Sequence, residues 1–90
     1  MALFPLGSIV ATPDAIRALE ASGTSAAELL RRHATGDWGE LDAEDVQSNN
    51  DAVRYGNRIL SSYPLDAHTK VWIITEWDRS ATTLLLPENY

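Results

Sequence analysis

The sequence predicts an α+β domain in which about three helices precede a three-stranded antiparallel meander, with the helices packed on one face. Helix caps and apolar residues at helical spacing occupy residues 12–56, whereas β-branched and aromatic runs separated by turns follow from residue 58. At 90 residues the chain can bury one small core, so we expect one domain over 1–90. Its composition, 44% hydrophobic and 22% charged residues, is typical of a globular protein.

The first helix is expected over 13–21. The tripeptide Thr12-Pro13-Asp14 supplies a cap, a proline at the first helical position and a carboxylate for the positive end of the dipole. Ile16 and Leu19, with the small Ala15 and Ala18, form the expected inward stripe, and Gly23 ends the helix. Just before this helix, residues 8–11 are compatible with a short strand.

Two further helices are expected before the sheet. Ser25 and Glu28 have the spacing of a capping box, and the helix that follows places Leu29, Leu30 and His33 on one stripe until Gly36. Asp42 caps a third helix over 43–55, whose inward stripe contains two asparagines, Asn49 and Asn50. Two amides at core-facing positions must find hydrogen-bond partners or face water.

Three strands are expected over 58–63, 70–77 and 81–86. Turns rich in Pro, Asp and Ser separate them, and Pro87 ends the last strand. A sheet of this size has two edges, and a second copy of the chain could pair with one of them, so a structural homodimer is one possible state.

Charge is concentrated in one segment of the chain. The net charge is −6, and residues 37–51 contain six carboxylates and no basic residue, while the remaining 75 residues hold seven acidic and seven basic side chains. One interpretation is a solvated loop and helix start; the other is an anionic surface that docks on a basic protein surface. The candidate partner-binding residues are Asp37, Trp38, Glu40, Asp42, Glu44, Asp45 and Asp51.

Trp38 has two possible roles within this segment. An aromatic ring beside charges is typical of an interface anchor, and the same ring could instead be a lid on the small core. His33 is expected in the core or at its boundary, since it lies on an apolar helix stripe. His68 falls in a turn, where we expect it to be exposed.

Several functional classes are disfavoured by what the chain lacks. It has no cysteine, no His/Cys or calcium-loop spacing and no glycine-rich phosphate loop, so we expect no metal and no cofactor. The negative balance disfavours direct binding of nucleic acid. No apolar run approaches the length of a membrane span and no secretion signal is apparent, so we expect a cytoplasmic protein.

Three motifs give the chain a resemblance to a known group of proteins. They are Gly36-Asp37-Trp38-Gly39, Ile74-Thr75-Glu76-Trp77-Asp78-Arg79-Ser80 and the ending Thr82-Thr83-Leu84-Leu85-Leu86-Pro87-Glu88-Asn89-Tyr90. The chain resembles short plasmid- and phage-borne bacterial proteins of the plasmid-related type. This resemblance implies a mobile genetic element and an inhibitor of host defence, such as an anti-CRISPR or antirestriction protein. The residues and the resemblance together favour a non-enzymatic inhibitor over an enzyme.

A second resemblance is to small metal-independent RNases of the barnase, EndoU, colicin and RelE-like superfamily. They have helices followed by an antiparallel sheet, with a helix His, a strand Arg and a late-strand Ser or Thr. In this chain the resemblance implies a general base, a phosphate clamp and an orienting hydroxyl at His33, Arg58 and Thr82 or Thr83.

Overall fold

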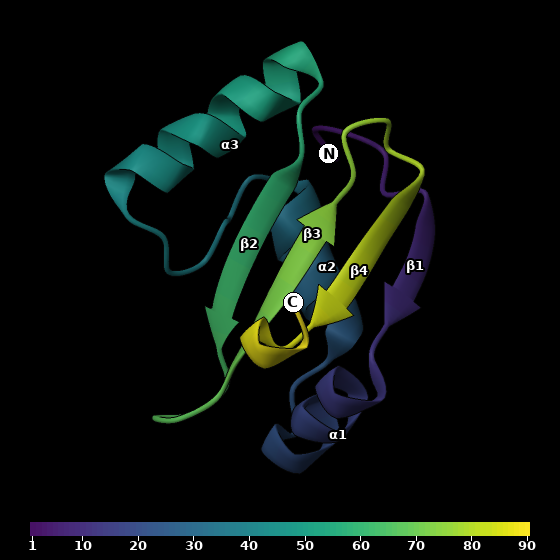
Figure 1. Ribbon diagram of the computed structural model, residues 1–90, viewed down its shortest axis with the longest axis vertical. Coiled ribbons are helices and arrows are strands. Elements are labelled where there is room, and N and C mark those ends of the chain that lie inside the picture. Colours follow the sequence, from purple (N-terminus) through teal and green to yellow (C-terminus); the bar gives the residue numbers. More distant parts are fainter.

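Three α-helices and a four-stranded mixed sheet form the fold of residues 1–90 in the computed structural model (Figure 1). None of its helices has the length and apolar character needed to cross a bilayer. In chain order the elements are β1 (Ser8–Ala11), α1 (Pro13–Ser22), α2 (Ala26–Ala34), α3 (Ala43–Tyr55), β2 (Ile59–Pro64), β3 (Lys70–Thr75), β4 (Ala81–Leu85) and the 3-10 helix η1 (Pro87–Asn89).

The sheet differs from the predicted meander by one strand. β2, β3 and β4 form the expected antiparallel meander, and β1 adds a fourth strand that runs parallel to β4, from Ser8 opposite Ala81 to Ala11 opposite Leu84. The strand order is β1-β4-β3-β2. The prediction of three purely antiparallel strands was therefore wrong, because β1 is short and its partner lies at the other end of the chain.

Side chains cap the helices where the sequence indicates. The Thr12 hydroxyl accepts a hydrogen bond from the Ala15 amide at 3.1 Å, and the Ser25 hydroxyl accepts one from the Glu28 amide at 3.3 Å. Gly56 adopts the left-handed conformation that ends α3. These local interactions account for the agreement between the predicted and observed helix bounds.

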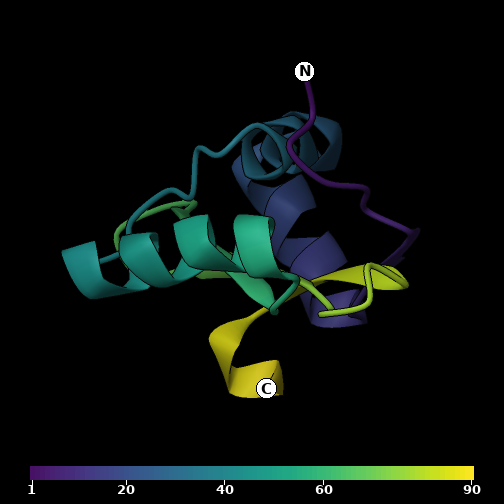
Figure 2. The same cartoon turned by 90° about the horizontal axis from the view of Figure 1, so that it is seen from above.

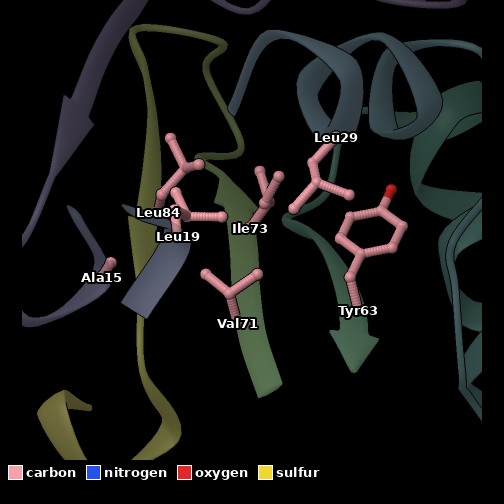
Figure 3. Close-up of a cluster of buried hydrophobic side chains, with 7 residues drawn as sticks. All are labelled: Ala15, Leu19, Leu29, Tyr63, Val71, Ile73 and Leu84. Atoms are coloured by element: carbon pink, nitrogen blue, oxygen red, sulfur yellow. The ribbon is translucent and has the colours of Figure 1, made fainter. Parts of the chain in front are cut away.

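The helices α1 and α2 cover one face of the sheet, and α3 lies along β2 at the edge (Figure 2). Side chains from both helices and from β2, β3 and β4 meet in the main core between them (Figure 3). Its buried members are Ala15, Leu19, Leu29, Tyr63, Val71, Ile73 and Leu84. Ile16, predicted to face inward, is instead exposed, because α1 buries its Ala15 and Leu19 side.

The C-terminal residues lie over the opposite face of the sheet (Figure 2). The Tyr90 ring contacts the Trp72 ring edge-on, with 5.9 Å between the centroids. The Asn89 amide holds this segment, since its oxygen accepts from the Thr12 hydroxyl at 2.9 Å and its nitrogen donates to the Asp14 carboxylate at 2.9 Å. The last residues are therefore tied to the start of α1.

Candidate functional site

The acidic segment forms a loop and the first turns of α3. The Asp42 carboxylate caps the helix by accepting a hydrogen bond from the Asp45 amide at 2.8 Å. Glu44 and Asp45 lie in the first turn, where the positive end of the helix dipole stabilises negative charge. Asp51 lies seven residues after Glu44, which places both on one face of the helix. All of these carboxylates are exposed.

Only one of the six carboxylates has a basic partner. Asp37 pairs with Arg32 at 2.7 Å, and this hydrogen bond is the main reason that the pKa of Asp37 is lowered. The other five form no ion pair. We call these five the acidic surface; its members are Glu40, Asp42, Glu44, Asp45 and Asp51.

Trp38 lies in the core beneath this segment. Its side chain is 5% exposed, and its ring stacks on Phe4 and meets His33 edge-on. The indole nitrogen donates to the Asn50 amide oxygen at 3.3 Å. Of the two roles considered for Trp38, the structure places it as a lid on the core, so its ring cannot anchor a partner in this conformation.

The loop around Trp38 also closes the outer edge of β2. The Ser62 amide donates to the Trp38 carbonyl at 3.0 Å, and the Ser62 carbonyl accepts from the Glu40 amide at 2.7 Å. Gly39 makes this approach possible: its φ is +77°, and a Cβ there would lie 2.0 Å from the Ser62 carbonyl oxygen. The acidic loop is thus held in place by backbone pairing that no local sequence pattern indicated.

Asn49 closes the same edge of β2 at Leu60, two residues before Ser62. It is buried, and its amide oxygen accepts from the Leu60 amide at 3.1 Å while its nitrogen donates to the Leu60 carbonyl at 2.6 Å. The side chain therefore replaces a neighbouring strand. Both asparagines on the predicted stripe have hydrogen-bond partners, since Asn50 accepts from Trp38.

His33 is fully buried and joined to a chain of hydroxyl groups. Its Nδ1 lies 2.5 Å from the Ser61 hydroxyl, its Nε2 lies 2.9 Å from the Thr75 hydroxyl, and that hydroxyl lies 2.7 Å from the hydroxyl of Thr82. Thr82 donates in turn to the Leu6 carbonyl at 2.7 Å. Because the Leu6 carbonyl can only accept, Thr82 donates to it, Thr75 donates to Thr82, and Nε2 of His33 donates to Thr75. In a neutral ring, Nδ1 then accepts from the Ser61 hydroxyl.

This arrangement suits a neutral structural histidine. Burial, with a smaller effect of the Arg79 charge, lowers the pKa of His33 to about 4. Both ring nitrogens already have partners, and the ring has no contact with solvent. A general base must reach the proton that it removes, and His33 does not reach the surface in this conformation.

The residues named for the RNase hypothesis are not brought together. His33 and Thr82 belong to one buried network, joined through Thr75. Thr83 faces the other side of the sheet, because side chains alternate along a strand. Arg58 is exposed, lies 3.7 Å from the Glu76 carboxylate and donates to the Tyr90 hydroxyl. The phosphate clamp and the general base of that hypothesis are therefore not in one site.

Arg79 has a structural role that the sequence did not indicate. Arg79 adopts the left-handed conformation, with φ of 61°, in the turn between β3 and β4. Its guanidinium donates to the Ala52 carbonyl at 2.8 Å and to the Asn57 carbonyl at 2.6 Å, and it lies over the Phe4 ring. It therefore ties the end of α3 to the sheet and to the N-terminal segment.

An open polar hollow of about 470 Å³ lies beside the acidic loop. Its lining combines Glu40 with Asp66 and His68 of the β2–β3 turn and with Lys70, the first residue of β3. No group of three or more His, Cys, Asp or Glu side chains is arranged to hold a metal ion. Comparison with protein-family models, with curated proteins and with solved structures finds no match for the chain.

Proposed function

We propose that this protein is a non-enzymatic inhibitor that docks, through the acidic surface, on a basic surface of a bacterial nucleic-acid-handling complex. The observation that carries the proposal is the set of five exposed carboxylates that have no ion-pair partner within the chain. Charges of one sign that the fold leaves uncompensated attract a partner of the opposite sign and suppress other partners. A groove that binds nucleic-acid phosphates is such a partner.

The acidic surface is held in a defined shape, which supports a binding role. Its loop is paired with β2 through Trp38 and Glu40, and its helix is fixed to β2 by Asn49. A surface that is ordered before binding loses less conformational entropy when it docks. Trp38 is left out of the proposed contact because its ring is buried.

The finer proposal is that the complex is a CRISPR or restriction complex, encountered by a protein encoded on a mobile element. It rests on the resemblance of the chain's motifs to plasmid- and phage-borne proteins. The buried state of His33 agrees with a mechanism that needs no catalytic group.

The experiment is affinity capture from a lysate of bacteria that express CRISPR and restriction complexes. The bait is the purified chain, compared with a variant in which Asp42→Asn, Glu44→Gln and Asp45→Asn remove three charges from the acidic surface. The matched control, Glu20→Gln with Asp78→Asn and Glu88→Gln, removes three exposed carboxylates elsewhere.

We expect the parent and the control to retain the same nucleic-acid-binding complex, and the first variant to lose it. Retention by all three baits would contradict the acidic surface as the contact. Retention of a complex with no nucleic-acid-binding subunit would contradict the class of partner.

A further inference from the structure

The two edges of the sheet differ in how their backbone groups are used. At the β2 edge, the outward amides and carbonyls of Leu60 and Ser62 are hydrogen-bonded to Asn49, Trp38 and Glu40. At the β1 edge no element lies beyond the strand (Figure 1). An unpaired edge strand is a ready template for another strand, and soluble proteins normally protect it with charge, proline or a covering segment.

The outward groups of β1 can be identified from its pairing with β4. The Ser8 amide donates to the Ser80 carbonyl and the Thr12 amide donates to the Leu84 carbonyl, both at 3.0 Å. Because alternate residues of a strand point to opposite edges, the backbone groups of Ile9 and Ala11 face outward. The strand has the sequence SIVA, with no charge and no proline, and the Ile9 and Val10 side chains are 49% and 50% exposed.

We propose that β1 pairs with β1 of a second copy of this chain, in antiparallel orientation, to form a continuous eight-stranded sheet. Two copies of one edge strand related by a twofold axis perpendicular to the sheet are necessarily antiparallel. In one register, every outward amide and carbonyl of Ile9 and Ala11 forms a hydrogen bond. This register places Ile9 opposite Ala11 of the second copy, and Val10 opposite Val10 of the second copy, on the twofold axis. Four backbone hydrogen bonds then form, and the two Val10 side chains meet as a close, non-hydrogen-bonded pair.

Side-chain shape favours a second copy in this register. An apolar hollow of about 290 Å³ opens on the helix-covered face beside β1, and Ala11, Ile16, Leu19 and Leu84 contribute to its lining. The large Ile9 of the second copy lies opposite the small Ala11, which is a lining residue of this hollow. Each copy thus places its exposed Ile9 beside the hollow of the other copy, next to Ala11.

The charge distribution permits this association despite the net charge of −6. The acidic surface belongs to the β2 edge, so three strand spacings, about 14 Å, separate it from β1. In the dimer the two acidic surfaces are then about 30 Å or more apart, several Debye lengths at physiological salt. Because the strand has four residues, we expect a weak dimer, with a Kd of about 10–100 μM.

Sedimentation equilibrium over a range of concentrations that spans this Kd tests the proposal. The mass of the parent is expected to rise from 9.9 kDa toward twice that value. Val10→Lys, which places two like charges on the axis, is expected to stay monomeric while keeping its circular dichroism spectrum. The matched control is Tyr55→Lys, which adds the same charge at an exposed aromatic residue of α3 and is expected to dimerise like the parent.

The register has its own test, because the chain contains no cysteine. With oxidised glutathione as the oxidant, Val10→Cys is expected to form a disulfide-linked dimer, since the paired residues on the axis have Cα atoms about 4.5 Å apart. Ser8→Cys is the control on the same exposed strand; its two Cα atoms would be about 13 Å apart, beyond the reach of a disulfide.

A parent that remains monomeric throughout, or Val10→Lys that dimerises like the parent, would overturn the proposal. Equal cross-linking of Val10→Cys and Ser8→Cys would overturn the register. None of these outcomes bears on the acidic surface, which lies at the other edge of the sheet.

Discussion

His33 fills a core position with a polar ring whose hydrogen bonds are all satisfied. Its apolar helix stripe predicted a core or boundary position, and the structure confirms this. Its partners could not be predicted, because Ser61 and Thr75 come from strands far away in the sequence and look like ordinary strand residues. The same holds for Arg79, whose role depends on carbonyls of α3 and of the α3–β2 connection.

The buried neutral state of His33 predicts a pH dependence of stability. Its pKa is about 4 in the folded state and 6.5 in the reference state, so between these values the unfolded chain binds a proton that the folded chain does not. The free energy of unfolding is therefore expected to fall as the pH falls from 6.5 to 4, by about 3 kcal/mol in total. Urea unfolding across this range measures it.

Two variants separate His33 from other titrating groups in this experiment. His33→Gln keeps a donor and an acceptor for the two hydroxyls and should flatten the dependence between pH 6.5 and pH 4. His68→Gln, in an exposed turn, should leave the dependence of the parent unchanged. Equal slopes for the parent and His33→Gln would show that other groups are responsible.

At the scale of elements, the closure of the β2 edge by Asn49 is one of the contacts that position α3. The sequence marked Asn49 and Asn50 as amides in need of partners, and it did not distinguish their roles. Asn49 acts as both donor and acceptor to the backbone of Leu60, whereas Asn50 only accepts from Trp38.

This difference predicts unequal effects of one chemical change at neighbouring positions. Asn49→Asp loses the donor and buries a charge against the Leu60 carbonyl, so we expect it to lower the free energy of unfolding by about 2–4 kcal/mol. Asn50→Asp keeps its acceptor oxygen and is exposed, so a change within about 0.5 kcal/mol is expected. Urea unfolding of both variants provides the comparison, and equal losses would contradict the strand-like role of Asn49.

Asp42 caps α3 and also carries a charge of the acidic surface, and two substitutions distinguish these contributions to stability. Asp42→Ala removes the acceptor for the Asp45 amide and should cost about 1 kcal/mol. Asp42→Asn keeps that acceptor, since Asn caps as well as Asp, and should stay within about 0.5 kcal/mol of the parent. Chemical unfolding distinguishes the two. A loss for Asp42→Asn as large as that for Asp42→Ala would mean that the fold needs the charge itself.

The elements differ in how far the sequence predicts them, for a physical reason. The helices were predicted within a few residues because their caps and glycine stops act locally. The meander of β2, β3 and β4 follows from short turns. The parallel pairing of β1 with β4 joins the two ends of the chain, and no local pattern encodes such a contact.

At the scale of the whole molecule, the fold places the acidic surface and the exposed strand β1 at opposite edges of the sheet. The sequence placed the entire charge excess in residues 37–51. The structure puts that segment at the β2 edge, with the exposed apolar strand β1 at the other. The two edges do not overlap, so the proposed contact with a basic protein surface and the proposed pairing with a second copy can be tested separately.

The salt dependence of binding to the captured complex tests the proposed role of the acidic surface most directly. For the parent, log Kd is expected to rise steeply with log salt, because uncompensated exposed charges are screened. With Asp42→Asn, Glu44→Gln and Asp45→Asn combined, the slope should be much shallower and the affinity at low salt weaker. The control with Glu20→Gln, Asp78→Asn and Glu88→Gln should match the parent. The same slope and affinity for all three proteins would contradict the account.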